Sequence, residues 1–354
     1  MSFDRVVLVA GTRPEFVKLH AVALALHAAN IPMVLIATNQ HRTALMKDAF
    51  LQQISWPCEI ETLPVSAQDP LAMLGEILTT LPSRLRERDF VMAEGDTTSV
   101  LAAHLVANKQ RLRLGHIEAG LRSYDLRMPE EHNRRVCDHL ADELFAPTDF
   151  DAGHLREERV PGRVHVVGNT VLDAVRQNVS RITAVPGLGE GYVLVTLHRQ
   201  ENVDQVPFLR ELVRFLEGLN MSCVFPVHPR TRDKLASARL WERITSLGHV
   251  RVLDPLDYLA FLGAMRHADL IVTDSGGVQE EATAPEIRRP VIVVRRSTER
   301  VPAIDAGFSI IAPGEADRLL GLVADRSWYR PAKTSPFGDG RAAEKIVGAL
   351  RVQD

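Results

Sequence analysis

Residues 270–281 read LIVTDSGGVQEE, and this stretch has the pattern of a strand, a turn and a helix. It begins with an apolar run typical of a buried strand, followed by Gly276 and Gly277 and by residues able to start a helix. A glycine turn between a strand and a helix presents backbone N–H groups at the helix N-terminus, where phosphates commonly bind. Two carboxylates, Glu280 and Glu281, follow within one turn. The stretch therefore predicts an α/β fold. It also predicts a ligand with an anionic group and a second polar part that a carboxylate can bind.

Short apolar runs alternate with helical patterns along the whole chain. They fall at residues 5–10, 32–37, 89–93, 112–116, 142–146 and 163–167, and then at 192–197, 222–227, 250–253, 269–273, 290–294 and 308–312. Continuous apolar strands separated by helices predict parallel sheets covered on both faces. The stretch 177–191, which contains AVPGLGEG, is the expected linker between two doubly wound, Rossmann-like domains.

The composition is that of an ordinary globular protein. The chain has 354 residues, 45% of them hydrophobic and 25% charged, and a net charge of −3, which gives no indication of nucleic-acid or membrane partners. Three widely spaced cysteines suit reduced thiols rather than a disulfide or metal framework. With neither a signal peptide nor a run of about 20 apolar residues, we expect a cytoplasmic protein.

The first strand is followed by GTRPEFVKL, residues 11–19. Thr12 and Glu15 have capping-box spacing, but a cation at Arg13 is unfavourable beside a helix N-terminus unless it meets an anion. Arg13 is therefore predicted to contact an anion, although an exposed side chain is the alternative. Lys18 has the pattern of a solvated helix face.

Three carboxylates follow strands of the first half and are expected near one cleft. Asp96 follows residues 89–93, Glu118 follows 112–116, and Glu130 opens the next helix. Clustered carboxylates raise one another's pKa, which supplies an acid and a base near neutral pH. The alternatives are that Asp96 or Thr97 only caps a helix and that Glu130 only suits a helix N-terminus.

The second half places His198 and His228 after its first two strands. Histidines at equivalent strand ends favour a phosphate or acid–base role for at least one of them. Ser275, Gly276 and Gly277 offer N–H and hydroxyl groups to a diphosphate, while Glu281 can accept hydrogen bonds from ribose hydroxyls. No metal site is predicted, because the HxE pattern at residues 116–118 lacks a following PCxxC.

As a set, these stretches resemble the non-hydrolysing UDP-N-acetylglucosamine 2-epimerase family. The resemblance rests on GTRPEFVK, NQHR, EGDTTS, GHIEAGLRS, MPEEHNR, GNTVLDA, VTLHRQENV, FPVHP, TDSGGVQEEA and STER, in that order between residues 11 and 300. It implies a GT-B-type fold with an interdomain active-site cleft and commonly a homodimer. The implied domains are 1–176 with the catalytic carboxylates, 177–335 with the UDP site, and a helix at 336–354 that crosses back to the first domain.

The resemblance also implies roles for individual residues. The catalytic groups would be Asp96, Glu118, Glu130 and His198. The substrate or UDP contacts would be Arg13, Lys18, Gln40, His41, His228, Phe261, Ser275, Gly276, Gly277, Glu281 and Arg300.

The expected reaction inverts C2 of UDP-N-acetylglucosamine by eliminating UDP, passing through 2-acetamidoglucal, and adding UDP back. The chain has no dinucleotide fingerprint, so no cofactor is predicted. The alternatives are an epimerase of a related UDP-2-acetamido sugar such as a diacetamido-uronate, a hydrolysing 2-epimerase, a GT-B glycosyltransferase, and a nucleotide-sugar sensor without turnover.

Some positions depart from the family pattern. Glu76 stands where an arginine is frequent, in a helix near the second nucleotide-sugar site of many bacterial members, so allosteric activation is not predicted. Leu256 replaces a glutamine that some members carry before the uracil-binding aromatic residue. The residues therefore predict the reaction type but not the substituents at C3 and C6 of the sugar.

Overall fold

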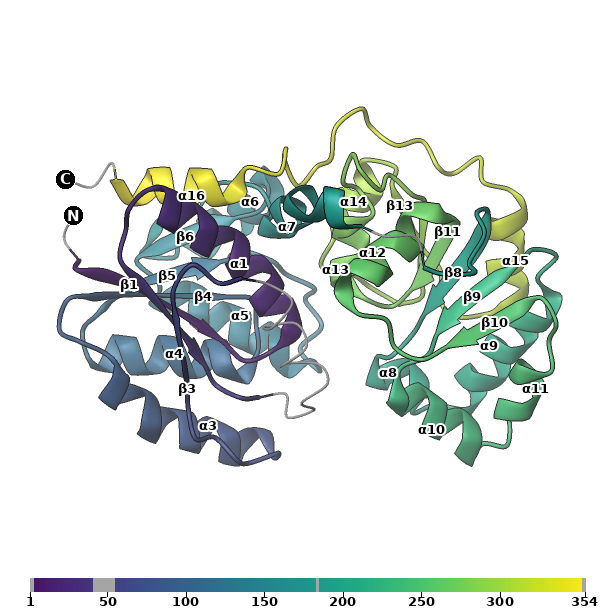
Figure 1. The fold of residues 1–354 in the computed structure, drawn as a ribbon, viewed down its shortest axis with the longest axis horizontal. Coiled ribbons are helices and arrows are strands. Elements are labelled where there is room, and N and C mark those ends of the chain that lie inside the picture. Colours follow the sequence, from purple (N-terminus) through teal and green to yellow (C-terminus); the bar gives the residue numbers. More distant parts are fainter. Residues whose placement is uncertain (1–2, 41–54, 183–184, 352–354) are drawn as a thin grey trace. The chain divides into compact units, whose positions relative to one another are not determined.

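The computed structural model describes residues 3–40, 55–182 and 185–351. The chain folds into two compact units, each built on one parallel sheet (Figure 1). Unit 1 comprises Met1–Gln177 and Phe337–Asp354, and unit 2 comprises Asn178–Pro336. The α/β class and the parallel sheets predicted from the sequence are confirmed.

Unit 1 contains a seven-stranded sheet with the order β3-β2-β1-β4-β5-β6-β7. Its strands are β1 (Arg5–Ala10), β2 (Met33–Ala37), β3 (Glu59–Thr62), β4 (Asp89–Glu94), β5 (Arg113–Ile117), β6 (Glu143–Ala146) and β7 (Arg163–Val166). All neighbours are parallel. The strand order reverses between β1 and β4, and ligands of such sheets bind at the carboxyl ends beside this point.

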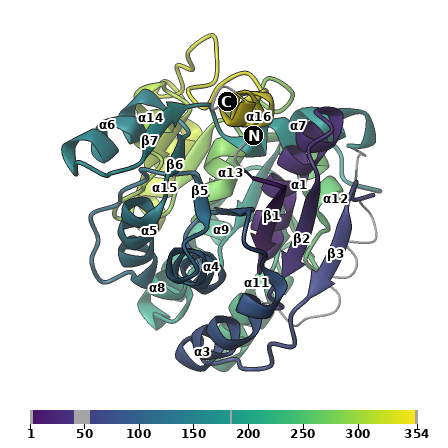
Figure 2. The same ribbon diagram turned by 90° about the vertical axis from the view of Figure 1, so that its left-hand side faces the viewer.

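The edge strand β3 was not predicted from the sequence. Its residues read EIET, and none of them is fully buried. It pairs with β2 on one side only, as Figure 2 shows at the edge of the sheet. An edge strand needs no continuous apolar run, so the pattern that marks the buried strands is missing.

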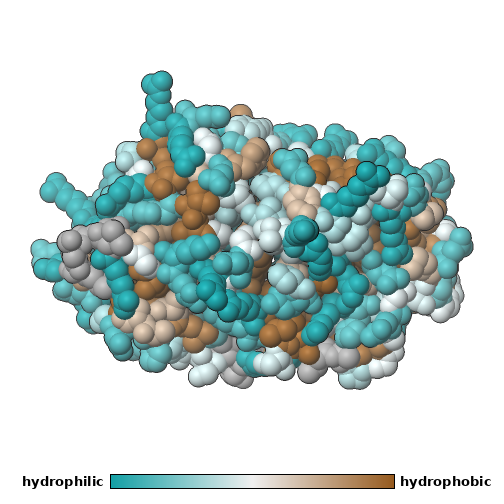
Figure 3. All heavy atoms as spheres, turned by 90° about the horizontal axis from the view of Figure 1, so that it is seen from above, coloured by the Kyte–Doolittle hydropathy of each residue, from teal (hydrophilic) through white to brown (hydrophobic). Residues whose placement is uncertain are grey.

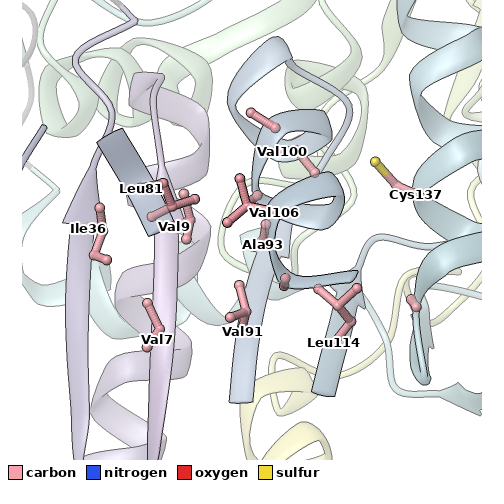
Figure 4. Close-up of a cluster of buried hydrophobic side chains, with 14 of the residues drawn as sticks. Val7, Val9, Ile36, Leu81, Val91, Ala93, Val100, Val106, Leu114 and Cys137 are labelled. Carbon is pink, nitrogen blue, oxygen red and sulfur yellow. The ribbon is translucent and has the colours of Figure 1, made fainter. Parts of the chain in front are cut away.

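The helices of unit 1 cover both faces of the sheet. They are α1 (Arg13–Ala28), α3 (Pro70–Thr80), α4 (Thr98–Lys109), α5 (Pro129–Leu140), α6 (Asp149–Glu157), α7 (Thr170–Asn178) and α16 (Ala342–Arg351), with a 3₁₀ turn at Leu81–Arg84. A second 3₁₀ turn, Val179–Arg181, lies at the start of unit 2. Helices α3, α4 and α5 pack side by side. Valine, isoleucine and leucine side chains fill the space between these helices and the sheet (Figure 4). This core fixes the strand ends that carry the candidate site.

Unit 2 repeats the same architecture with a six-stranded sheet in the order β10-β9-β8-β11-β12-β13. The strands are β8 (Tyr192–Thr196), β9 (Cys223–Pro226), β10 (Val250–Leu253), β11 (Ala268–Thr273), β12 (Val291–Val293) and β13 (Ser309–Ile311). The helices are α8 (Gln200–Val203), α9 (Val206–Gly218), α10 (Pro229–Ser237), α11 (Trp241–Thr245), α12 (Tyr258–His267), α13 (Gly276–Glu281), α14 (Val301–Asp305) and α15 (Ala316–Ala324). Here the order reverses between β8 and β11, which places His198 and the glycine turn at neighbouring strand ends.

The C-terminal segment belongs to unit 1, where α16 packs against α1 (Figure 1). The Asp173 carboxylate accepts the N–H groups of Ala342 and Ala343 at 3.0 and 2.9 Å, which satisfies the first turn of α16. The apolar face of α16 is buried, including Ile346 and Leu350. Unit 1 is therefore assembled from the two ends of the chain.

The face of the molecule in Figure 3 carries mainly hydrophilic side chains, with apolar ones in separate groups. Among the described residues, no helix is both long and apolar enough to cross a membrane.

Candidate active site

The turn after β1 is built around a buried glutamate. Glu15 Oε2 accepts the N–H groups of Gly11 and Thr12 at 2.5 and 3.0 Å, and burial raises the pKa of this carboxyl group. The capping box predicted at Thr12 and Glu15 is confirmed. Arg13 is the first residue of α1 and is half-buried. Its contact with an anion stays a prediction.

Lys18 does not lie on a solvated helix face, so that interpretation is wrong. Its side chain is buried, and Nζ lies 2.7 Å from Glu94 Oε1 and 2.6 Å from Glu118 Oε1. Asn169 Nδ2 donates to the same Glu118 oxygen at 2.8 Å. The helix pattern missed this because Glu94 ends β4 and Glu118 follows β5, and only the strand order β1-β4-β5 brings these positions close to α1.

The Lys18 cluster holds two carboxylates around one ammonium group. Burial raises the pKa of Glu94 well above its usual range, and the Lys18 charge opposes this only in part. Nearby carboxylates with unequal proton affinity can serve acid and base steps. Glu94 was not among the residues predicted from the sequence. Its position at the end of a buried strand, next to Gly95 and Asp96, would have indicated a site residue.

Asp96 follows the glycine turn of β4 and contacts α5. Its Oδ2 lies 2.8 Å from Arg134 Nε and 2.6 Å from Arg134 Nη2, and Asn133 Nδ2 donates to its backbone oxygen at 2.8 Å. Two nitrogens of one guanidinium group therefore contact a single oxygen of this carboxyl group. Thr97, not Asp96, caps α4, by accepting the Val100 N–H.

The two glutamates that open α5 have different surroundings. Glu131 is buried and accepts the N–H groups of Ser123 and Tyr124 at 2.9 and 3.1 Å, so it anchors the preceding loop. Burial would raise its pKa, but these hydrogen bonds and Arg134 hold it below the usual value. Glu130 is half-buried in the same turn. This division leaves Glu130 as the candidate for substrate chemistry.

Gln40 lies after β2, and its Oε1 accepts hydrogen bonds from the hydroxyl and the N–H of Ser99 at 2.6 and 3.2 Å. Ser99 Oγ also lies 2.6 Å from the Thr38 hydroxyl. This arrangement ties the end of β2 to the start of α4. His41 lies outside the described residues.

In unit 2, the loop after β8 is held by Asp274. This fully buried carboxylate accepts the N–H groups of His198 and Arg199, at 3.1 and 3.0 Å, and the Asn202 amide at 3.1 Å. His198 Nδ1 lies 3.5 Å from Asp274 Oδ1. Asp274 directly precedes Ser275, so a single carboxylate connects the histidine loop to the glycine turn.

Two histidines meet at this edge of the second sheet. The rings of His198 and His228 lie 5.8 Å apart. Loss of hydration lowers the pKa of His198, while the Asp274 charge opposes this change. His228 caps α10, where its Nδ1 accepts the Arg230 N–H at 3.2 Å. A neutral His198 suits a proton acceptor near neutral pH.

Glu280 of α13 is paired with a cation that lies next to the glycine turn. Glu280 is fully buried, with Oε1 2.7 Å from Arg300 Nε, and Arg300 Nη1 lies 3.1 Å from Glu299 Oε1. A Cβ on Gly276 would lie only 3.1 Å from Glu299 Oε1 and 3.4 Å from Arg300 Cζ. Thus Glu280 positions a cation beside the glycine turn rather than repelling an anion there.

The remaining candidates flank this turn. Ser275 is the N-cap residue of α13, and a Cβ added to Gly277 would meet nothing within 4 Å. Glu281 is 8% exposed. Phe261 is half-buried in the first turn of α12, whose cap is the Asp257 carboxylate. The roles of these residues in binding a nucleotide stay predictions.

Comparisons with known proteins agree with the resemblance read from the sequence. Residues 24–351 match the family described as UDP-N-acetylglucosamine 2-epimerase. The chain is 35% identical to UDP-N-acetylglucosamine 2-epimerase of Methanocaldococcus jannaschii, with 97% of this chain and 98% of that protein covered. It is 32% identical to UDP-2,3-diacetamido-2,3-dideoxy-D-glucuronate 2-epimerase of Pseudomonas aeruginosa, with 98% and 99% covered.

The fold comparison extends over the same length. The crystal structure of M. jannaschii UDP-GlcNAc 2-epimerase in complex with UDP-GlcNAc and UDP has a TM-score of 0.90 and 34% identity, with 98% of this chain and 99% of that chain covered. The predicted GT-B-type pair of Rossmann-like folds is confirmed. By sequence and by fold, the chain belongs to the UDP-N-acetylglucosamine 2-epimerase family.

Proposed function

We propose that this protein is a non-hydrolysing epimerase that converts UDP-N-acetylglucosamine to UDP-N-acetylmannosamine. The observation that carries the proposal is the group of Lys18, Glu94, Glu118 and Asp96 at the carboxyl ends of β4 and β5. Inversion at C2 needs proton transfer on both faces of the sugar ring, and these residues bring several acid–base groups to one sheet edge.

The proposed reaction has two halves that use the same groups. A base removes the proton from C2, the electron pair forms the C1–C2 double bond, and the C1–O bond breaks so that UDP leaves. The resulting 2-acetamidoglucal then takes a proton at C2 from the opposite face, and a UDP oxygen adds to C1. Asp96, Glu118, Glu130 and His198 are the proposed acid–base groups.

The diphosphate must be held through both halves of the reaction. We assign this to the Ser275–Gly277 turn, Arg300 and Arg13, because oriented N–H groups and cations stabilise the charge that develops on a leaving phosphate. His228, Phe261 and Glu281 would bind the rest of the nucleotide. Lys18, Gln40 and His41 would belong to the sugar side.

The experiment is proton NMR of the purified protein with UDP-N-acetylglucosamine in D₂O, without added cofactor. We expect UDP-N-acetylmannosamine to appear and deuterium to enter C2 of both epimers. Asp96→Asn should abolish exchange, whereas Asp149→Asn, an exposed aspartate of α6, should leave it unchanged.

The same spectra separate the alternatives. Free sugar that accumulates beside UDP would identify a hydrolysing 2-epimerase. Exchange only with UDP-2,3-diacetamido-2,3-dideoxy-glucuronate would favour the reaction named for the Pseudomonas relative. UDP binding without exchange of any tested sugar would favour a glycosyltransferase or a sensor.

Cellular setting and assembly follow from the same proposal. We propose a cytoplasmic location, supported by free thiols at Cys58, Cys137 and Cys223. A homodimer and a role in the biosynthesis of cell-surface polysaccharides are proposed from the family resemblance alone. Sedimentation of the purified protein tests the dimer directly.

A further inference from the structure

A buried histidine lies behind the carboxylates of unit 1. His116 is on β5 and is fully buried. Its Nδ1 lies 2.7 Å from Asp138 Oδ1, and its Nε2 lies 2.8 Å from the Gly95 carbonyl oxygen. Both partners are acceptors, and a neutral imidazole carries only one N–H. His116 and Arg122 lower the pKa of Asp138 against the effect of burial, which favours its ionised form. With Asp138 ionised, both contacts are hydrogen bonds only when the ring is an imidazolium ion.

The charges around His116 favour this state. Burial would lower the pKa of His116, but Asp138 outweighs burial and raises it. Arg122 faces the same carboxylate, with Nη2 2.7 Å from Asp138 Oδ2, and is itself paired with Glu158 at 2.7 Å. The fourth neighbour, His104 of α4, lies 5.0 Å from His116 by ring centroid, and burial lowers its pKa to about 3. Of the two histidines, His116 is therefore the one whose surroundings favour the charged form.

The bonds of His116 and Asp138 lead to both carboxylate loops. On one side, the Gly95 carbonyl directly precedes Asp96. On the other side, Asp138 Oδ2 accepts the Gly120 N–H at 3.2 Å, two residues after Glu118. Gly95 and Gly120 have φ values of +89° and +86°. A residue with a side chain would strain the backbone at either position, so each loop turns at a glycine.

Helix α5 holds the same assembly from its outer side. Arg134 and Asp138 lie one turn apart; Arg134 contacts the Asp96 carboxylate, and Asp138 contacts His116. A shift of His116 therefore moves the Asp96 backbone relative to α5, the helix whose Arg134 holds the Asp96 side chain. The ring of His116 therefore links the Asp96 and Glu118 loops, in addition to the Lys18 bridge and to the Gly95 N–H, which donates to the Ile117 carbonyl oxygen at 3.2 Å.

We propose that His116 is a positioning residue, a buried imidazolium whose two N–H groups link the Asp96 loop to the Glu118 loop and set the placement of both carboxylates for proton transfer at C2. The proposal rests on the proposed function above. His116 itself touches no substrate in this scheme and acts through Gly95 and Asp138.

The first test needs no substrate. The ¹⁵N and proton NMR signals of the ring of His116, assigned through its absence in His116→Gln, are followed from pH 6 to pH 8.5. We expect protons on both nitrogens throughout this range. A ring with one protonated nitrogen at pH 7 would overturn the proposal, whatever the activity of the protein.

The second test compares kinetics. His116→Gln keeps one donor, so we expect kcat and the rate of C2 deuterium exchange to fall about 100-fold through misplacement of the reacting groups, with KM changed by less than about 3-fold. The matched control is His165→Gln, because His165 also pairs with a buried carboxylate, Glu143 at 2.8 Å, but on β7. The control should keep wild-type kcat.

A double variant separates positioning from stability. Because His116 and Asp138 act as one link, His116→Gln/Asp138→Asn should lose no more activity than the worse single variant. A folded His116→Gln protein with wild-type kcat would overturn the positioning role and leave the proposed function intact. Wild-type protein without C2 exchange would instead reject the proposed function, while the NMR test still decides the charge of the link.

Discussion

At the scale of single residues, the structure changes what Lys18 is expected to do. A lysine buried between Glu94 and Glu118 neutralises one of two carboxylates that water cannot reach freely. Removing one partner of a buried charge pair leaves the other charges uncompensated, which costs more than the pair contributes. The ammonium group therefore supports the fold and holds the Glu118 carboxylate in place.

Lys18→Met should destabilise unit 1 by about 3–5 kcal/mol near pH 8. Burial already raises the pKa of Glu94 in the folded protein, so binding of a proton by Glu94 favours the folded state. This stabilisation is complete below the ordinary pKa of 4.5. It is lost as the pH rises through the raised pKa. The cost of Lys18→Met should therefore shrink at pH 5. Urea unfolding at both pH values measures this, and an equal cost at pH 5 and pH 8 would contradict it.

Asp274 offers a second prediction for a single residue. Asp274→Asn removes the charge that opposes the lowering of the His198 pKa and weakens the hydrogen bonds to the His198 and Arg199 N–H groups. We expect the acidic limb of the kcat/KM profile to move to lower pH and kcat to fall about 10-fold or more.

The control for this change is Asp69→Asn. Asp69 also accepts two backbone N–H groups, at the start of α3, but it belongs to unit 1, whereas His198 belongs to unit 2. Its pH profile should match the wild type. An unshifted acidic limb in Asp274→Asn would remove Asp274 from the account of His198.

At the scale of helices and strands, the apolar strands were predictable and the polar edge strand β3 was not. Runs such as VVLV at residues 6–9 are apolar throughout because helices cover both faces of a parallel sheet. Strand β3 lacks such a run, since it lies at the edge. The loops that carry Asp96, Glu118 and His198 were also predictable, because ligands of parallel sheets bind at the carboxyl ends of the strands.

Contacts across the sheet could not be predicted from sequence spacing. The ion pairs of Lys18 with Glu94 and of Arg134 with Asp96 join residues 76 and 38 positions apart. They depend on the strand order and on where α5 packs. A short-range pattern shows a lysine on a helix but not which strand end it meets, which is why the solvated-face interpretation failed.

Two glycines in different elements should respond oppositely to alanine. Gly75 lies inside α3 with open space around a Cβ, so Gly75→Ala should stabilise the protein by about 0.5–1 kcal/mol. Gly120 has φ +86°, and its Cβ would meet the Asp151 carbonyl oxygen, so Gly120→Ala should be strongly destabilising. Thermal unfolding of both variants measures the contrast; destabilisation by Gly75→Ala would contradict the helix argument.

At the scale of the whole molecule, the chain leaves unit 1, builds unit 2, and returns to unit 1 as α16. The return is fastened by Asp173, by the Phe337 carbonyl oxygen, which accepts the Asn169 N–H at 2.9 Å, and by the buried face of α16. Burial holds Asp173 at a pKa of about 6. The first sheet therefore depends on residues more than 160 positions away.

Leu350→Ala should destabilise unit 1 by about 2–5 kcal/mol, the cost of a large-to-small change in a core, and leave unit 2 unaffected. Glu344→Ala, an exposed position of the same helix, is the matched control and should change stability by less than about 0.5 kcal/mol. Hydrogen exchange resolved by peptide distinguishes the two units. Equal loss of protection in both would contradict an effect confined to unit 1.

The return of α16 has a consequence for how the protein is made. During translation the N-terminal residues leave the ribosome first. Residues 1–177 therefore emerge while the surface of α1 that α16 covers is still open to solvent. Unit 2 can finish folding first, because its residues are contiguous. A nascent chain stalled before residue 342 should thus carry a completed second unit and an unfinished first one, exposed to chaperones and proteases until translation ends.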